Sequence, residues 1–132
     1  MGSDDAMVSP GELEQVMREA GALAMEYWPG AGNDVESWEK SPDNRVSEAD
    51  LAVDRYLHRA LGDLAPDAGW LSEETADETA RAEQRRCWIV DPIDGTRDFL
   101  RGRDDWCVSV ALVEEGEILK RYEEITAIPA DP

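Results

Sequence analysis

Residues 88–99 read WIVDPIDGTRDF, a short apolar run that is followed at once by two aspartates, a glycine and a threonine. The run 87–90 is compact and apolar, which is typical of a buried strand that delivers a loop to a site. Asp91 and Asp94 stand three positions apart on the expected turn, so both carboxylates can face one cation, and hard oxygen ligands of this kind suit magnesium. Taken as bare spacing, the pattern is also common in capped turns that bind nothing.

Two helical patterns precede this stretch. Ser9 is the predicted N-cap of the first, with a proline directly after it, and apolar residues recur at helical spacing until residues 28–30 (Trp-Pro-Gly) stop the pattern. The second helix is predicted to begin at residues 47–50 (Ser-Glu-Ala-Asp) and to end at residues 66–69 (Pro-Asp-Ala-Gly). Residues 31–45, between them, are rich in turn formers and predict a loop or a short irregular hairpin.

The strand signals follow the helices. Residues 70–72 form a short apolar segment, residues 87–90 a buried strand, residues 106–113 a second and longer strand, and residues 118–119 the start of a returning strand. The acidic stretch that ends at Gln84 is either an exposed helical turn or a loop. Helices followed by strands predict an α+β fold, with two amino-terminal helices packed on one face of a largely antiparallel sheet.

The charge balance narrows the possible partners. The 132 residues include 31 acidic and 13 basic side chains, for a net charge of −18, and a field of this sign repels nucleic-acid polymers and anionic membranes. It also repels a small phosphate ester, so such a substrate requires bound divalent cations that reverse the local sign. No stretch approaches the roughly 20 apolar residues of a membrane span. Residues 1–9 do not form a secretory signal, so we expect a cytoplasmic location.

The segment 88–99 resembles the signature of the inositol monophosphatase superfamily, which includes 3'(2'),5'-bisphosphate nucleotidases and, more distantly, fructose bisphosphatases. Two further segments agree with it in order and spacing. Residues 40–57 (KSPDNRVSEADLAVDRYL) resemble the family's lysine loop and the helix after it, and residues 69–75 (GWLSEET) resemble its Glu-Glu segment. The resemblance covers most of residues 9–117 and implies the first half of the layered α/β sugar-phosphatase fold. The stretch 38–96 is most similar to the bacterial bisphosphate nucleotidases.

The resemblance assigns a metal-binding role to four matching positions. Glu73 matches a metal-bridging glutamate, and Asp91 matches the carboxylate that two metal ions share. Ile93 contributes its main-chain carbonyl, and Asp94 is a ligand of the second ion. Glu74 is assigned instead to a solvated acidic run. The implied cofactor is Mg2+.

The catalytic pair implied by the resemblance is Asp50 with Thr96, which orient and deprotonate the attacking water, assisted by Glu73 at the metal. Asp50 also has a structural alternative, because it stands three residues after a serine, as the acid of a capping box does. Gly95 and Thr96 match main-chain donors to the substrate phosphate. Lys40 is a possible site residue, although a lone loop lysine is usually only solvated.

The implied reaction is magnesium-dependent hydrolysis of a phosphomonoester, either an inositol phosphate or a 3'(2'),5'-bisphosphate nucleotide. A metal-activated water attacks in line with the leaving ester oxygen, and no covalent enzyme intermediate is needed. The expected partner is a small phosphorylated substrate, with no nucleic-acid polymer and no membrane. The residues that select the substrate lie mainly outside the stretch that the resemblance covers.

The resemblance ends near residue 118. We therefore expect a disordered leader at 1–8, a metal-binding domain at 9–117 and a divergent tail at 118–132, without the family's second domain and the aspartate that completes its second metal site. Such a chain should bind magnesium weakly, hydrolyse phosphate esters slowly and self-associate, with a homodimer as one form, through an uncovered sheet edge. The alternative is a catalytically incompetent half that acts as an interaction module or has no function of its own.

Overall fold

The computed structural model describes residues 8–72, 74, 86–114 and 117–124. The elements within these residues, in chain order, are α2 (Pro10–Met25), η1 (Pro29–Ala31), β1 (Ser37–Ser41), β2 (Asn44–Ser47), α3 (Glu48–Leu64), β3 (Gly69–Ser72), β4 (Arg86–Asp94), α5 (Thr96–Leu100), β5 (Cys107–Glu114) and β6 (Glu117–Glu124). No helix in this part of the chain has both the length and the apolar character that a membrane crossing requires.

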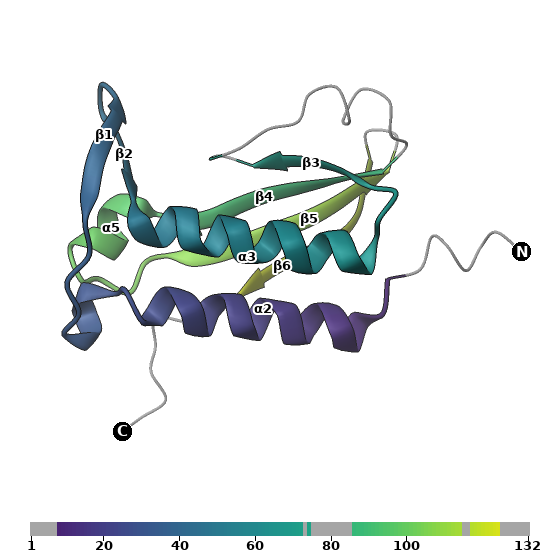
Figure 1. The fold of residues 1–132 in the computed structure, drawn as a ribbon, viewed down its shortest axis with the longest axis horizontal. Coiled ribbons are helices and arrows are strands. Elements are labelled where there is room, and N and C mark those ends of the chain that lie inside the picture. Colours follow the sequence, from purple (N-terminus) through teal and green to yellow (C-terminus); the bar gives the residue numbers. More distant parts are fainter. Residues whose placement is uncertain (1–7, 73, 75–85, 115–116, 125–132) are drawn as a thin grey trace, which may run out of the picture.

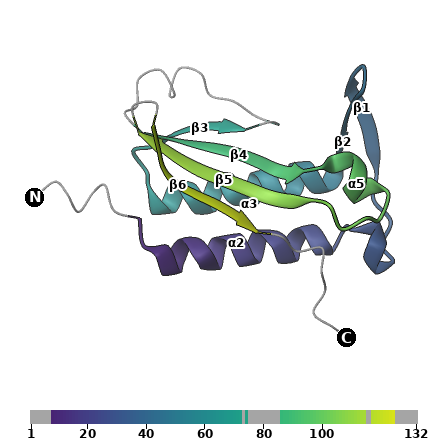
Figure 2. The same cartoon turned by 180° about the vertical axis from the view of Figure 1, so that it is seen from behind.

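The architecture is one sheet covered on one face by two helices. Within the described residues, four strands form a sheet in the order β3-β4-β5-β6, and β1 and β2 form a separate hairpin. β3 runs parallel to β4, whereas β4 with β5 and β5 with β6 are antiparallel. α2 and α3 lie side by side against this sheet in both views (Figures 1 and 2). The predicted α+β fold, with two amino-terminal helices on a largely antiparallel sheet, is confirmed.

Both long helices begin where their capping signals predict. The Ser9 side chain accepts a hydrogen bond from the Glu12 amide at 3.3 Å, and Pro10 occupies the first helical position, where its missing N–H has no helical partner to lose. α3 begins with a complete capping box between Ser47 and Asp50. The cap at Ser47 fixes the start of α3, and with it the position of the aspartate in its first turn.

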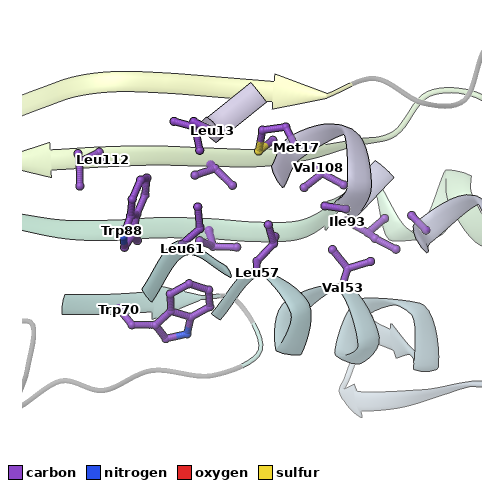
Figure 3. Packing of buried hydrophobic residues seen from close by; sticks show 14 of the residues in the cluster. Leu13, Met17, Val53, Leu57, Leu61, Trp70, Trp88, Ile93, Val108 and Leu112 are labelled. Carbon is purple, nitrogen blue, oxygen red and sulfur yellow. The ribbon is translucent and has the colours of Figure 1, made fainter. Parts of the chain in front are cut away.

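The core lies between the helices and the sheet (Figure 3). Side chains alternate across a strand, so every second residue of β4 and β5 faces α2 and α3. The fully buried side chains on these inner faces come from both layers: Leu13, Leu57, Leu61, Trp88, Val108, Val110 and Leu112. Burying each such side chain contributes about 1.5–3 kcal/mol, which makes this layer contact the main stabilising feature of the fold.

β4 is longer than the sequence indicated. The sequence predicted a strand at 87–90 followed by a loop, but β4 continues to Asp94. The pairing shifts there: Asp91 lies opposite Ser109 and Asp94 opposite Cys107, so three steps on β4 correspond to two on β5. This is a β-bulge, and a bulge tolerates Pro92, which has no N–H for the ladder. The expected loop at this point was therefore wrong, and the bulged end of a strand carries the aspartates.

The hairpin of β1 and β2 confirms one of the two alternatives for residues 31–45. Its strands are antiparallel, with Trp38 opposite Val46 and a register shift between Glu39 and Ser41. The turn places Asp43 at φ 61°, a left-handed conformation that aspartate tolerates better than most residues. The turn at the tip of the hairpin thus has a defined conformation, and β2 contacts α5 near the base of the hairpin (Figure 1).

The described residues extend at both ends beyond the domain expected from the sequence. Val8, which the sequence analysis assigned to a leader, is 2% exposed and belongs to the core cluster. Residues 1–7 lie outside the described part. At the other end, the predicted returning strand exists as β6, which pairs with β5 as far as Glu124 opposite Val108. The first part of the predicted divergent tail is therefore a strand of the main sheet.

Candidate active site

Asp50 is a buried carboxylate in the first turn of α3, and only 1% of the residue is exposed. Its Oδ2 atom accepts hydrogen bonds from the Ser47 amide at 2.8 Å and from the Ser47 hydroxyl at 2.7 Å. The Ser47 Oγ atom in turn accepts from the amides of Ala49 and Asp50 at 3.1 and 3.2 Å. The capping role that the sequence offered as the structural alternative is therefore present.

The other carboxylate oxygen of Asp50 faces the end of β4. Thr96, the first residue of α5, donates its hydroxyl to Asp50 Oδ1 at 3.0 Å, although the two residues are 46 positions apart. This is the contact that the family resemblance led us to expect. The Thr96 hydroxyl oxygen also lies 3.1 Å from the carbonyl oxygen of Ile93. Because a hydroxyl has one hydrogen, these two acceptors compete for it. Capping and the contact with Thr96 thus use different oxygens of Asp50 and do not exclude each other.

The environment of Asp50 changes its acidity. Burial raises the pKa of Asp50 above its ordinary value, and the hydrogen bonds from Ser47 and Thr96 oppose that shift. A raised pKa makes the Asp50 carboxylate a stronger proton acceptor than an ordinary exposed aspartate.

A pocket of about 390 Å³ opens beside this pair. Its less exposed lining comes from the end of β4, the start of α5 and the residue two positions after β3: Glu74, Asp91, Ile93, Gly95 and Thr96. Its exposed lining comes from the hairpin and from α5: Asp43, Asn44, Arg45 and Arg97. The structure thus brings together four of the positions that the sequence singled out, namely Asp91, Ile93, Gly95 and Thr96.

Glu74 is a functional candidate that the sequence analysis misjudged. Its side chain is only 8% exposed and is paired with Lys40 through a 3.2 Å contact between Lys40 Nζ and Glu74 Oε1. Burial raises the pKa of Glu74, the Lys40 hydrogen bond lowers it, and the negative charges of Asp50 and Asp54 raise it further. The assignment of Glu74 to a solvated acidic run was wrong, because the fold turns the residue inward toward the pocket. Lys40 is likewise held by an ion pair, with 37% of its side chain exposed.

A hydrogen-bonded network that joins Asp54, Ser72 and the Glu74 backbone was not apparent from the sequence. The Ser72 hydroxyl donates to Asp54 Oδ1, and its oxygen accepts from the Glu74 amide at 3.1 Å. Asp54 is 2% exposed and lies one helical turn after Asp50 on α3. The network therefore joins α3 to the end of β3 and orients the backbone that carries Glu74. In the sequence, this network could have been found only from the spacing of Asp50 and Asp54, which puts both aspartates on one face of α3.

Substitution of this serine tests the network. We expect Ser72→Ala to lower the free energy of unfolding by about 1–3 kcal/mol, because it removes a hydrogen bond to a buried carboxylate and the acceptor of a backbone amide. Urea denaturation followed by fluorescence would measure the change. Ser41→Ala is the matched control, because Ser41 is exposed at the end of β1 and such a change costs roughly 0.5 kcal/mol or less. Equal losses in the two variants would contradict the network.

Two predicted metal ligands remain, and of these the structure describes only Asp94. Glu73 lies outside the described residues. Asp94 is exposed and lines an adjacent pocket of about 340 Å³, together with Asp104 and Asp105, and Gly95 lines both pockets. Within the described ranges, no three His, Cys, Asp or Glu side chains are grouped closely enough to hold a metal ion. Convergence of Glu73, Asp91 and Asp94 on one cluster of ions therefore stays a prediction.

Comparisons with known proteins show which family this chain resembles. A family model described as the inositol monophosphatase family matches residues 11–119. The 3'(2'),5'-bisphosphate nucleotidase CysQ of Salmonella typhimurium is 36% identical over 104 residues, which cover 78% of this chain and 42% of the nucleotidase. The inositol-1-monophosphatase of Rhizobium meliloti is 34% identical over 107 residues, which cover 81% of this chain and 39% of that protein.

A solved structure has a similar fold. The crystal structure of the extragenic suppressor protein suhB from Bartonella henselae matches with a TM-score of 0.76 at 28% sequence identity, over 89% of this chain and 45% of that chain. This chain therefore spans less than half the length of each of these three relatives.

Proposed function

Because the chain belongs to the inositol monophosphatase family, we propose that its site is the water-activating and phosphate-binding part of a metal-dependent phosphomonoesterase. The observation that carries the proposal is the hydrogen bond from Thr96 Oγ1 to the buried Asp50 carboxylate, at the edge of a pocket that also contains Asp91. The substrate class is a small phosphorylated molecule. The names of the relatives leave both an inositol phosphate and a bisphosphate nucleotide as candidates.

The proposed proton path runs through Thr96. When its hydroxyl donates to Asp50, the same oxygen has lone pairs that can accept a hydrogen bond from a water molecule in the pocket. As that water attacks phosphorus, its proton passes to Thr96 and the Thr96 proton passes to Asp50. Asp50 is suited to this step because burial raises its pKa. The cap at Ser47 holds the carboxylate in place while its other oxygen takes the proton.

The oxygen donors at the pocket fit a magnesium ion. The Asp91 carboxylate and the Ile93 carbonyl are hard ligands, and Glu73 is the third proposed donor. Asp94 is the proposed ligand of a second ion beside them. A bound magnesium ion would lower the pKa of the attacking water and balance the charge of the phosphoryl group. The main-chain amides of Gly95 and Thr96 are proposed to hold the phosphate, and Lys40 to fix Glu74 at the pocket.

Magnesium titration with a matched pair of variants tests this proposal. We expect the chain to bind Mg2+ at millimolar concentration by calorimetry, and Asp91→Asn to weaken that binding roughly 10-fold or more, because it removes one of few charged ligands. Asp63→Asn is the control, since Asp63 is exposed near the end of α3 and loses the same charge. Equal Mg2+ affinity in the Asp91 variant and the unaltered chain would contradict the proposed ligand set.

A phosphate-release assay separates catalysis from binding. Release of inorganic phosphate from inositol 1-phosphate or from adenosine 3',5'-bisphosphate, dependent on Mg2+, is the expected result for the proposed activity. Mg2+ binding without any release would favour the alternative of a non-catalytic interaction module. A cytoplasmic location and a homodimer are further parts of the proposal, and size-exclusion chromatography tests the second.

A further inference from the structure

Asp54 is a buried carboxylate that the proposed reaction does not use. It lies one helical turn after Asp50 on α3 and is 2% exposed. It is not among the described residues that line the pocket beside Asp50 and Thr96. Burial of a carboxylate is costly unless hydrogen bonds replace the lost water. The fold therefore has to supply partners for Asp54, and one of these partners connects it to the pocket.

Ser72, the last residue of β3, makes this connection. Its hydroxyl donates to Asp54 Oδ1, and the same oxygen accepts from the main-chain amide of Glu74 at 3.1 Å. A serine hydroxyl has one hydrogen and two lone pairs, so it makes both bonds at once. Ser72 is itself buried, with 8% of the residue exposed, so bulk water does not readily replace either partner. A carboxylate on α3 thus helps to fix the position of the Glu74 backbone.

Glu74 extends this constraint into the pocket. It lines the same pocket as Asp91, and its Oε1 atom lies 3.2 Å from the Nζ atom of Lys40 on the hairpin. The backbone of Glu74 is therefore held from α3 through Ser72, and its carboxylate is held from β1 through Lys40. A side chain that is fixed at both ends keeps its negative charge at one place in the pocket.

A fixed carboxylate beside Asp91 affects the binding of a cation there, even if it is not a ligand. Opposite charges attract over several ångströms, and the attraction depends on their separation. Solvent and salt screen this attraction less in a partly buried pocket than on an open surface, and the Glu74 side chain is largely buried. The hydrogen-bonded groups behind a metal site typically change its metal affinity by roughly 10–100-fold. The network from Asp54 to Glu74 stands in this position.

We propose that Asp54 and Ser72 are positioning residues for the Mg2+ site: they hold the Glu74 carboxylate at the pocket and so raise the affinity for Mg2+, although neither residue contacts the ion. This inference rests on the proposed function, which puts Mg2+ beside Asp91. A network that only stabilised the fold would behave differently. Its loss would lower the free energy of unfolding and leave the Mg2+ affinity of the folded chain unchanged.

Calorimetric Mg2+ titration of the full chain tests the positioning role, at a temperature at which urea denaturation shows each variant to be folded. We expect Ser72→Ala to weaken Mg2+ binding roughly 10-fold, because it removes both bonds of the hydroxyl. Ser72→Thr keeps a hydroxyl and should stay within about 2-fold of the unaltered chain. Asp54→Ala should lose as much affinity as Ser72→Ala, and the double variant no more than either single one, since both act through the same bonds. Ser72→Ala removes only a hydroxyl, so it decides the question if Asp54→Ala does not fold.

A second substitution shows whether the effect passes through Glu74. In a Glu74→Gln background, Ser72→Ala should change the Mg2+ affinity by less than about 2-fold, because the charge that Ser72 positions is no longer there. An undiminished loss in that background would contradict the route through Glu74.

Ser9→Ala is the control for a general loss of stability, because Ser9 caps α2 and does not line the pocket. It should bind Mg2+ as tightly as the unaltered chain. An unchanged Mg2+ affinity in Ser72→Ala, or an equal loss in Ser9→Ala, would overturn the positioning role while the proposed function stands. If the unaltered chain binds no Mg2+ at millimolar concentration, the proposed function fails, and the positioning role fails with it.

Discussion

Asp50→Asn is expected to reduce phosphate release by roughly 10²–10⁴-fold, the range that a positioned general base contributes. Asparagine has nearly the same shape as aspartate, and its side-chain oxygen can still accept from the Ser47 amide, so the start of α3 should persist. Its amide nitrogen, however, cannot take a proton from Thr96. The substitution therefore separates the two roles that the structure places on the two oxygens of Asp50.

The same variant has a defined effect on stability. The folded pKa of Asp50 is raised, so the folded state holds the proton more tightly than the unfolded state. The contribution of Asp50 to stability is then largest at low pH and falls as pH rises from the ordinary aspartate pKa through the raised one. We therefore expect Asp50→Asn to be at least as stable as the unaltered chain at neutral pH, in urea denaturation at several pH values.

Ser9→Ala is the control for the Asp50 variant. Ser9 caps α2, away from the pocket, and its loss should cost about 0.5–2 kcal/mol in unfolding free energy. Phosphate release should not change. Undiminished release in Asp50→Asn would show that Asp50 only caps the helix. An unfolded Asn variant would show that the carboxylate charge is needed for the cap.

Gly95→Ala is expected to lower the free energy of unfolding by roughly 2–4 kcal/mol, a large part of the 5–15 kcal/mol typical of a domain. Gly95 has φ 99°, in the left-handed region where a Cβ atom is unfavourable. An added Cβ would also lie 2.6 Å from the backbone carbonyl oxygen of Asp105 and 3.3 Å from the Cα atom of Trp106. Backbone atoms cannot turn aside as a flexible side chain can, so the bulged end of β4 or the chain before β5 must move.

A second glycine provides the control. Gly62 lies within α3, and a Cβ atom there would meet nothing within 4 Å. Gly62→Ala should therefore raise stability by about 0.5–1 kcal/mol, since alanine loses less backbone freedom on folding than glycine. Thermal denaturation of both variants would measure the contrast. A Gly95 variant as stable as the Gly62 variant would mean that the turn after β4 adapts, and that its conformation is not imposed by the neighbouring backbone.

The local signals in the sequence were sufficient for the elements that depend on a few neighbouring residues. The caps at Ser9 and Ser47 act within one helical turn, and both helices begin where these residues predict. The helical periodicity of the apolar residues likewise predicted the two helices that form the core, and the apolar residues 87–90 predicted the strand that packs against them. The pairing of Asp50 with Thr96 followed from a family resemblance and not from any local pattern, because nothing in either segment specifies the other.

The tertiary structure decided the features that depend on how distant segments pack. The burial of Glu74 follows from its pairing with Lys40, 34 residues earlier. The Ser72 network follows from the packing of β3 against α3, and the bulge after Asp91 follows from the register of β4 on β5. Arg45 and Arg97 share a pocket only because the hairpin lies against α5. Residue type and spacing determine the helix caps and the buried faces of helices and strands. The burial that shifts the pKa of a side chain exists only after the helices have packed on the sheet.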